Sequence, residues 1–361
     1  MKRLPILVRL LRDPDRAASL SLAEWDLALR QSTSTNLSPT LLALLEERGL
    51  LDAVPAQPRA HLEWVRALAT RHRQAVRFEV ECIQAALVKE AAPLLLLKGA
   101  AYAMAGLRAG AGRLFGDIDI LVPKTRLDQV ESALMLHGWA GTGHDAYDQR
   151  YYRQWMHELP PMQHVRRRTS IDVHHAILPE TAPVRPDPDK LRAAAVPIEG
   201  MPGLATLAPC DMVLHSAVHL FFDGEFDKGL RDLLDLHRML QEFGGRPGFW
   251  DALPGRAREL QLGRPLFYAL RYSRRLLGTR VPDEVLDAVA PLGPGLPLRM
   301  LMDGLFGRAL LPMHTSCDDA FSAAARFILY VRGNWLRMPP RLLARHLFHK
   351  AFISKKTEIK K

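Results

Sequence analysis

Apolar residues recur at helical spacing through residues 1–90, which predicts a helical N-terminal region. Ser21 and Glu24 have the spacing of a capping box, in which the serine oxygen and the glutamate carboxylate satisfy free backbone N–H groups. Ser38 followed by Pro39 predicts a second helix start, because proline suits the first helical position. The long amphipathic run 61–89 contains neither glycine nor proline and predicts a further helix.

The pattern changes at Pro93, after which short apolar runs replace the helical spacing. Four leucines at 94–97 predict a buried strand that turns into a helix over 100–107. Residues 116–122 begin by alternating polar and apolar positions, as a half-buried strand does, and residues 127–136 predict a helix.

Two further strands are expected at 154–165 and 169–177, with a turn of three arginines between them. The first is interrupted by Pro160 and Pro161, which cannot donate to a ladder of hydrogen bonds. The order strand, helix, strand, helix and hairpin predicts a small mixed sheet.

The proline-rich segment 181–208 is expected to be a connection, beyond which helical spacing returns. Helices are expected at 211–222, 228–243, 265–277 and 283–289, then a loop at 291–297 and more helix to about residue 352. The sequence therefore predicts an α+β protein. A small mixed-sheet domain at 91–180 would lie between a helical N-terminal region at 1–90 and a helical C-terminal region at 181–361.

Charge is concentrated at the C-terminal end. The segment 326–361 holds ten Lys or Arg and one acidic residue, so it carries +9 of the chain's net +10. A basic tail suggests an anionic partner such as nucleic acid or a membrane surface, and the basic amphipathic stretch 341–350 could dock on either. The alternative is a solvated helix end. Tyr330 and Trp335 could stack a base or belong to the core.

Three widely spaced cysteines argue against a disulfide framework or a zinc finger and favour a reducing cytoplasm. The short N-terminal apolar run is broken by Arg9 and has no small-residue cleavage site, so a signal peptide is not expected. No stretch of about 20 apolar residues predicts a transmembrane segment.

Asp117 and Asp119 carry the first candidate chemistry. Two positions apart on a strand, both carboxylates point to one face, while Ile118 and Ile120 share the other. Like charges on one face repel unless a cation lies between them, and hard oxygen ligands suit Mg²⁺ or Mn²⁺. The alternative is a pair of surface aspartates on an edge strand.

Asp172 would add a third carboxylate if its strand pairs with that of Asp117, and His174 would share its face. Three carboxylates can hold two divalent ions about 4 Å apart. Otherwise Asp172 would pair with Arg167 or Arg168 in the hairpin.

A phosphate-binding turn is expected around Lys98 and Gly99. The glycine allows close backbone approach, the following helix offers free N–H groups, and the lysine adds a point charge. Arg113 and Gly116 precede the aspartate pair and could reach the same phosphates. Each of these features alone is also typical of an ordinary loop.

The segments LLLLKGAAYAM, GRLFGDIDILVP and SIDVHHAI together resemble the uncharacterised bacterial nucleotidyltransferases of the NTP_transf_5 type, within the DNA polymerase β-like superfamily. The resemblance is specific over residues 94–178 and looser over 211–219 and 231–236. It implies that Asp117 and Asp119 are metal ligands and that Asp172 is the third carboxylate and general base. Lys98, Gly99, Arg113 and Gly116 would hold the triphosphate of an NTP such as ATP.

The sequence departs from the superfamily pattern at the phosphate-binding turn. Better-known superfamily members carry Gly-Ser about a dozen residues before the paired aspartates. Here Lys98-Gly99 stands in that place, and Gly99 lies 18 residues before Asp117.

The acceptor stays open among a small molecule, a peptide or protein, and RNA. His174, His219 and Asp235 are candidate substrate-side residues; His215 and His219 with Asp235 could instead bind a metal or pack within the helices. A toxin-like enzyme that modifies tRNA and a catalytically silent NTP-binding or interaction protein are the alternative functions.

Overall fold

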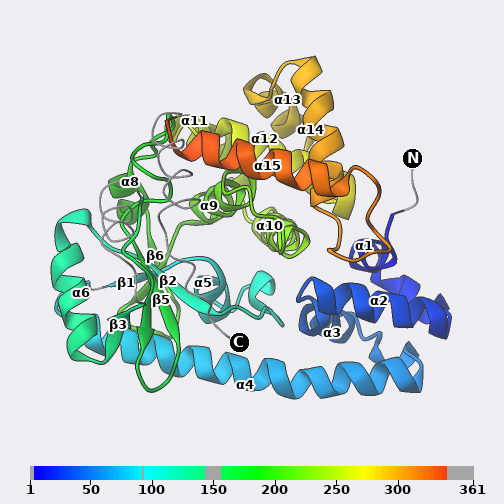
Figure 1. The fold of residues 1–361 in the computed structure, drawn as a ribbon, viewed down its shortest axis with the longest axis horizontal. Helices are drawn as coiled ribbons and strands as arrows, with labels where there is room; N and C mark the ends of the chain where they lie inside the picture. Colours follow the sequence, from blue (N-terminus) through cyan, green and yellow to red (C-terminus); the bar gives the residue numbers. More distant parts are fainter. Residues whose placement is uncertain (1–3, 92, 143–155, 340–361) are drawn as a thin grey trace, which may run out of the picture.

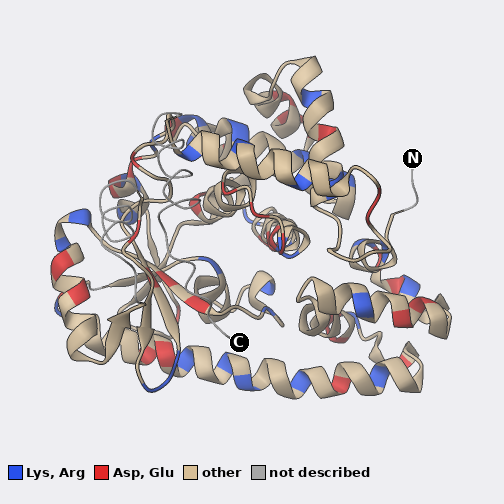
Figure 2. Cartoon of the chain, in the orientation of Figure 1, with Lys and Arg blue, Asp and Glu red and all other residues tan. Residues whose placement is uncertain are grey.

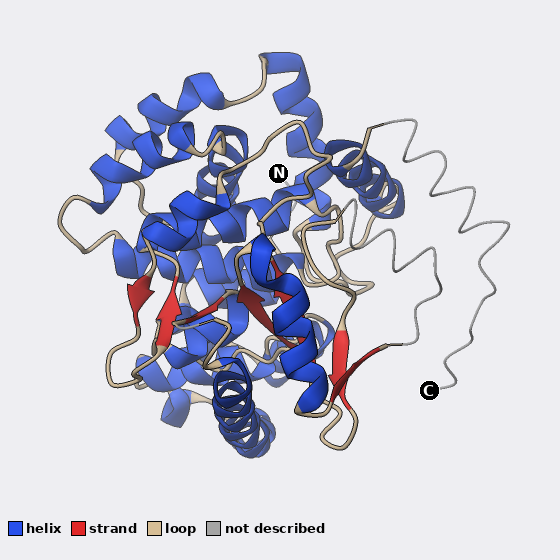
Figure 3. Cartoon of the chain, turned by 90° about the vertical axis from the view of Figure 1, so that its left-hand side faces the viewer, coloured by secondary structure: helices blue, strands red, loops and turns tan. Residues whose placement is uncertain are grey.

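The structure, a computed structural model, describes residues 4–91, 93–142 and 156–339. It confirms the α+β class: one mixed sheet lies at one side of the molecule, and helices cover it and extend away from it (Figures 1 and 3). Within the described part of the chain, no helix combines the length and apolarity needed to cross a membrane.

The N-terminal helices are α1 (Ile6–Arg12), α2 (Leu22–Ser34), α3 (Ser38–Glu47) and α4 (Ala56–Leu87). The capping box before α2 is formed as expected: Ser21 Oγ accepts from the Glu24 N–H, and the Glu24 carboxylate accepts from the Ser21 N–H at 3.1 Å. Helix α4 has 32 residues and runs along the molecule from the other N-terminal helices to the sheet (Figure 1). It therefore ties the N-terminal helices to the sheet.

The sheet has seven strands in the order β3-β4-β5-β2-β1-β7-β6. Pairing is parallel between β2 and β5 and between β1 and β7, and antiparallel elsewhere. The strands are β1 (Leu94–Leu96), β2 (Asp117–Leu121), β3 (Trp139–Gly141), β4 (Met162–His164), β5 (Ser170–His174), β6 (Val196–Pro197) and β7 (Leu204–Thr206). Helices α5 (Lys98–Met104) and α6 (Leu127–Leu136) follow β1 and β2 directly.

Two expectations for the sheet need correction. The strand expected at 154–165 is ordered as a strand only from Met162, because Pro160 and Pro161 have no N–H to donate; residues 154–155 lie outside the described part. The segment 181–208, expected to be a connection, contains helix α8 (Pro188–Ala193) and strands β6 and β7. Strand β7 pairs with β1, so the sheet takes strands from both sides of residue 180.

Up to residue 339, seven α-helices follow the sheet: α9 (Pro209–Phe222), α10 (Gly229–Phe243), α11 (Phe249–Glu259), α12 (Gly263–Tyr272), α13 (Asp283–Val289), α14 (Leu296–Ala309) and α15 (Ser322–Arg337). Helix α11 was not expected, since Pro254 lies inside it and disrupts its helical pattern. Helix α14 begins at Leu296, inside the loop expected at 291–297.

An aromatic cluster holds α9, α12 and α14 together. The Phe221 ring lies edge-on to Phe306 with centroids 5.2 Å apart, and the Tyr272 ring lies 5.1 Å from Phe306. All three residues are buried. Aromatic pairs at such distances add to the stabilisation from burial alone, so this cluster fixes the position of α9, whose C-terminal end reaches the candidate site.

His237 on α10 predicts a pH dependence of stability. It is buried, its Nδ1 lies 2.7 Å from Thr279 Oγ1, and burial, aided by the Arg238 guanidinium, lowers its pKa to about 4. The unfolded chain binds this proton at pH values below about 6.5, so stability is complete above that pH and falls as pH decreases towards 4, by about 3 kcal/mol. Urea titrations give the free energy of unfolding at pH 7 and at pH 4.5. The difference between these two free energies should be smaller for His237→Gln than for wild type. An equal difference in both proteins would contradict this role.

Candidate active site

The pairing of β2 with β5 places the three candidate aspartates on one face of the sheet. The strands are parallel, with Asp119 opposite Asp172 and Asp117 opposite Ser170. Ile118 and Ile120 point the other way and are buried in the core. Side chains alternate along a strand, so Asp117 and Asp119 share a face, and the register brings Asp172 beside Asp119.

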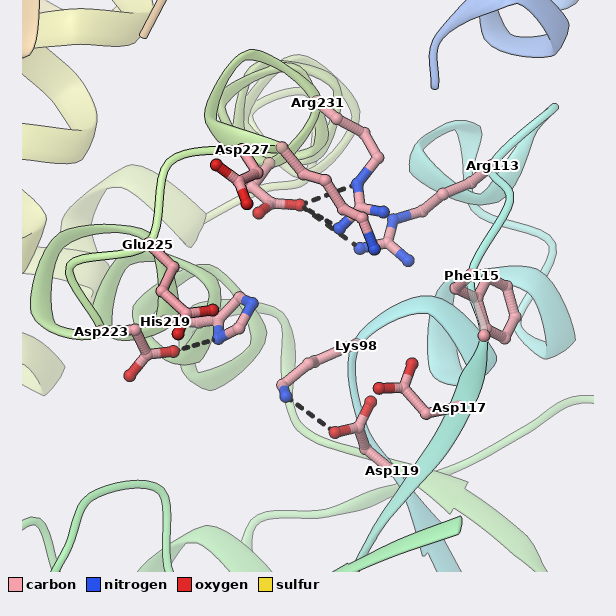
Figure 4. A pocket seen from close by; sticks show the side chains of 13 residues that line it. Lys98, Arg113, Phe115, Asp117, Asp119, His219, Asp223, Glu225, Asp227 and Arg231 are labelled. Carbon is pink, nitrogen blue, oxygen red and sulfur yellow. Dashed lines mark hydrogen bonds and ion pairs between the residues drawn. The ribbon is translucent and has the colours of Figure 1, made fainter. Parts of the chain in front are cut away.

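Asp119 is buried and bound by Lys98 and His174. Lys98 Nζ lies 2.7 Å and His174 Nε2 3.0 Å from the same carboxylate oxygen, Oδ1 (Figure 4 shows the lysine contact). Burial alone would raise the pKa of Asp119, but attraction to Lys98 and the hydrogen bond from His174 hold it well below its usual value. Asp119 is therefore ionised, and its charge is already balanced in the metal-free protein.

Asp172 has the opposite electrostatics. Burial raises its pKa to about 7, and the carboxylates of Asp119, Glu158 and Asp117 add to the rise, in that order, with Asp117 the weakest. Within the described residues no Lys or Arg forms an ion pair with Asp172, and Arg167, its expected hairpin partner, instead binds Glu79 at 2.7 Å. The site thus concentrates negative charge that a divalent cation would stabilise.

His174 joins this face to a second acidic group. Its Nδ1 lies 3.2 Å from Glu158 Oε2, while its Nε2 contacts Asp119. Among the described residues, His157, Glu158 and His174 form the one trio of acidic, histidine or cysteine side chains whose ligand atoms all lie within 4.8 Å of one another. These residues could also hold a metal. His157 and Glu158 were missed from the sequence because Pro160 and Pro161 obscure the strand pattern there.

The turn at Lys98 and Gly99 is constrained by packing. Lys98 has φ +44°, a left-handed conformation that costs energy for a non-glycine residue. A Cβ added to Gly99 would lie 2.3 Å from Arg113 Nη1 and 2.7 Å from Phe115 Cδ1. Glycine is therefore needed at position 99 because the 113–115 segment packs closely against it. From the sequence, this glycine was expected to allow the close approach of a ligand instead.

Gly99→Ala should consequently destabilise the protein, by about 1–3 kcal/mol, because Arg113 and Phe115 must shift. Gly116→Ala is the matched control, since nothing lies within 4 Å of a Cβ there and its stability should stay within about 0.5 kcal/mol of wild type. Thermal and urea unfolding of both variants measure the difference. Equal stability of the two would show that the close approach at Gly99 is not required.

Arg113 is held by buried carboxylates from α10. Its Nε lies 2.6 Å from Asp235 Oδ2, and its Nη2 lies 3.6 Å from Asp232 Oδ1. Asp232 also binds Arg231 at 2.7 Å. Burial raises the pKa of Asp235. Burial also acts to raise the pKa of Asp232, but the combined attraction of Arg231, His219 and Arg113 outweighs it and lowers that pKa. Asp235, a candidate substrate-side residue, thus lies against Arg113, the expected phosphate-binding residue.

A cleft of about 290 Å³ is lined by Asp117 and Asp119, whereas Asp172 does not line it. One wall comes from β2 and the turn at Lys98, and the other from the end of α9, the following loop and the start of α10 (Figure 4). The second wall is rich in charge: His219, Asp223, Glu225, Asp227, Lys228, Arg231 and Asp232. Most of these were missed, although the acidic loop 223–227 between two expected helices was a signal that could have found them.

His219 lines this cleft and is paired within its own helix end. Its Nδ1 lies 2.5 Å from Asp223 Oδ2. His215 is buried, and burial lowers its pKa well below the usual value. Since Asp235 binds Arg113, these histidines and Asp235 do not form a metal-binding trio among the described residues.

The basic tail expected to bind an anionic partner falls largely on residues 340–361, including the amphipathic stretch 341–350, and so lies outside the described residues. Tyr330 and Trp335 on α15 are 42% and 58% exposed, which places neither in the core.

Comparison with known proteins adds family information. A family model described as uncharacterised nucleotidyltransferase matches residues 21–278, most of the chain, including the sheet and helices α9 to α12. No curated protein matches the chain.

Proposed function

The chain belongs to the family of uncharacterised nucleotidyltransferases, and we propose that it moves a nucleoside monophosphate from an NTP to an acceptor in a divalent-cation-dependent reaction. The observation that carries the proposal is the register of β2 and β5, which sets Asp119 opposite Asp172, with Asp117 on the same face. Family membership supports nucleotidyl transfer in general. The cation and the residue roles are inferred from the site, and the acceptor is left open among a small molecule, a peptide or protein, and RNA.

The donor set has the chemistry that suits Mg²⁺ or Mn²⁺, although among the described residues the ligand atoms of the three aspartates do not all lie within 4.8 Å of one another. Asp117, Asp119 and Asp172 offer carboxylate oxygens, the ligands that these hard cations prefer. Burial is the first cause of the raised pKa of Asp172, and the neighbouring carboxylates are the second; a cation would offset the charge of those carboxylates. When bound, the cation would neutralise charge on the triphosphate and on the attacking oxygen.

In the proposed reaction, an acceptor oxygen forms a bond to the α-phosphorus of the NTP. The bond between that phosphorus and the oxygen bridging to the β-phosphate breaks, and pyrophosphate leaves with the electron pair. Asp172 is the proposed base that accepts the acceptor proton. Transfer of this kind depends mainly on positioning and charge neutralisation, which the charged walls of the cleft supply.

Lys98, Gly99, Arg113 and Gly116 are proposed to hold the nucleotide. Lys98, Arg113 and Gly116 line the cleft, whereas Gly99 shapes the turn beneath it. In the free protein Lys98 binds Asp119, so the lysine would exchange this carboxylate for phosphate when the nucleotide enters. His174 would then orient Asp119, to which it remains hydrogen-bonded.

A second candidate function draws on the same contact. Because Lys98 and His174 already satisfy Asp119, the protein could use the fold as a silent NTP-binding scaffold. The two functions differ in turnover, since a scaffold binds NTP without releasing pyrophosphate. The toxin-like modification of tRNA is a special case of the first function.

The test is incubation with NTPs labelled at the α- or the γ-phosphate, together with cell extract and Mg²⁺ or Mn²⁺. Nucleotidyl transfer predicts α-label in an acceptor fraction and γ-label only in pyrophosphate. Treating the labelled fraction with nuclease or protease then identifies the acceptor class. Transfer of γ-label to an acceptor would instead indicate a kinase, and binding without release of pyrophosphate would indicate a scaffold.

A further inference from the structure

A second, larger cavity of about 1080 Å³ lies away from the aspartates, bounded by α1, α3, the later part of α10 and the turn after α12. The cleft uses residues 228–232 of α10, and this cavity uses residues 237–245. No residue lines both spaces. The cavity is therefore a separate site.

The lining of this cavity is strongly basic. Five arginines and one carboxylate line it, a formal net charge of +4. By contrast, residues 1–325 together carry a net charge of only +1, because the C-terminal segment accounts for +9 of the total of +10. The arginines are Arg12 from α1, Arg48 from the end of α3, Arg108, Arg238 from α10, and Arg280.

The single carboxylate, Glu47, is already shared by two of these arginines. It lies 2.9 Å from Arg238 Nη2 and 3.3 Å from Arg108 Nε. Arg12, Arg48 and Arg280 are exposed and form no ion pair with any carboxylate in the described part of the chain. Their charge is therefore available to a ligand.

The positions of Arg12 and Arg48 explain why these charges are tolerated. Arg12 is in the last turn of α1 and Arg48 caps α3. The carboxyl end of a helix favours a cation. Two of the three unpaired guanidinium groups thus lie where the helix ends favour a positive charge.

We propose that this cavity binds a ligand that carries several phosphate groups, either a free phosphate chain or a nucleic-acid strand. Guanidinium groups match phosphate oxygens in bidentate geometry, and they surround the cavity from separate elements. Trp250, half-buried on the same lining, offers an aromatic face on which a base can stack. The proposal stands independently of the transferase reaction, because it uses none of the residues of the cleft.

The test compares two triple charge reversals with the same change in net charge. The cavity variant is Arg12→Glu/Arg48→Glu/Arg280→Glu, and the control is Arg71→Glu/Lys89→Glu/Arg166→Glu, whose three positions are exposed and lie outside the cavity. The probes are tripolyphosphate and a labelled single-stranded RNA of about 12 nucleotides. Binding is measured by calorimetry and fluorescence anisotropy in EDTA, which removes divalent cations from the cleft.

We expect the cavity variant to bind at least one probe about tenfold more weakly than the control. For RNA, the slope of the logarithm of the binding constant against the logarithm of salt concentration should become shallower by about 0.7 per lost phosphate contact. A loss confined to RNA identifies a strand as the ligand, and a loss confined to tripolyphosphate identifies a free phosphate chain. Equal affinities in the two triple variants, or no binding of either probe to wild type, would overturn the proposal.

Arg12 packs near Gly278, so the triple variant could fold poorly. The double variant Arg48→Glu/Arg280→Glu leaves this contact intact and should show most of the same loss. Its thermal unfolding is compared with that of the control, so that weaker binding is assigned to the cavity only in a folded protein.

Discussion

Asp117→Asn is expected to lower the rate of NTP-dependent pyrophosphate release by about a thousandfold, while the protein stays folded. Asp117 lines the cleft, and within the described residues its carboxylate has no ion pair, so the substitution removes one proposed cation ligand without breaking an ion pair. Losing charge stabilisation of several kcal/mol corresponds to a rate change of that order. Pyrophosphate release in saturating Mg²⁺ or Mn²⁺ measures it.

Asp52→Asn is the matched control, because the Asp52 side chain is fully exposed and far along the chain from the cleft. Its pyrophosphate release should equal that of wild type. Equal rates for Asp117→Asn and Asp52→Asn would remove Asp117 from the catalytic group. Asp119→Asn is less suitable as a first test, since it also disturbs the contacts with Lys98 and His174.

Arg113→Met is expected to destabilise the folded protein by about 3–5 kcal/mol, because it leaves the buried carboxyl group of Asp235 without its ion-pair partner. The methionine keeps much of the side-chain volume, so the loss reports charge rather than packing. Urea unfolding at neutral pH measures it. The readout is stability, so it does not depend on the role proposed for Arg113 in nucleotide binding.

The matched variant is Arg113→Met/Asp235→Leu, which removes both charges. Replacing a buried ion pair by apolar groups is often neutral, so most of the lost stability should return, although Asp232 still lies nearby. If the free energy of unfolding of Arg113→Met lies within about 1 kcal/mol of the wild-type value, the buried ion pair does not stabilise the contact between α10 and the 113–115 segment.

Local sequence patterns predicted several elements, among them the strand that carries two of the candidate aspartates. The alternation at 116–122 located β2, and the capping box at Ser21 and Glu24 located the start of α2. Helix α13 was expected at 283–289 and has those bounds. Each of these signals comes from residues that are close together in the sequence, so it can be recognised without knowledge of the fold.

What was missed depends on contacts between distant segments. Strand β7 is three residues long and buried throughout, so it has no alternation to reveal it, and its pairing with β1 and β6 defines it. The same holds for Arg113, expected to reach phosphates from a loop but paired with Asp235, 122 residues away. The wall of the cleft from α9 and α10 likewise exists only in the folded chain (Figure 4). Figure 2 colours the positions of the charged residues along the whole chain.

The most direct measurement is the anomalous diffraction of Mn²⁺ in a crystal grown with a non-hydrolysable NTP analogue. We expect an Mn²⁺ peak in the cleft, bound by the carboxylates of Asp117 and Asp119, and we expect Lys98 to have moved from Asp119 to the triphosphate. A peak held only by His157, Glu158 and His174, or an analogue bound with no Mn²⁺ at the aspartates, would contradict it.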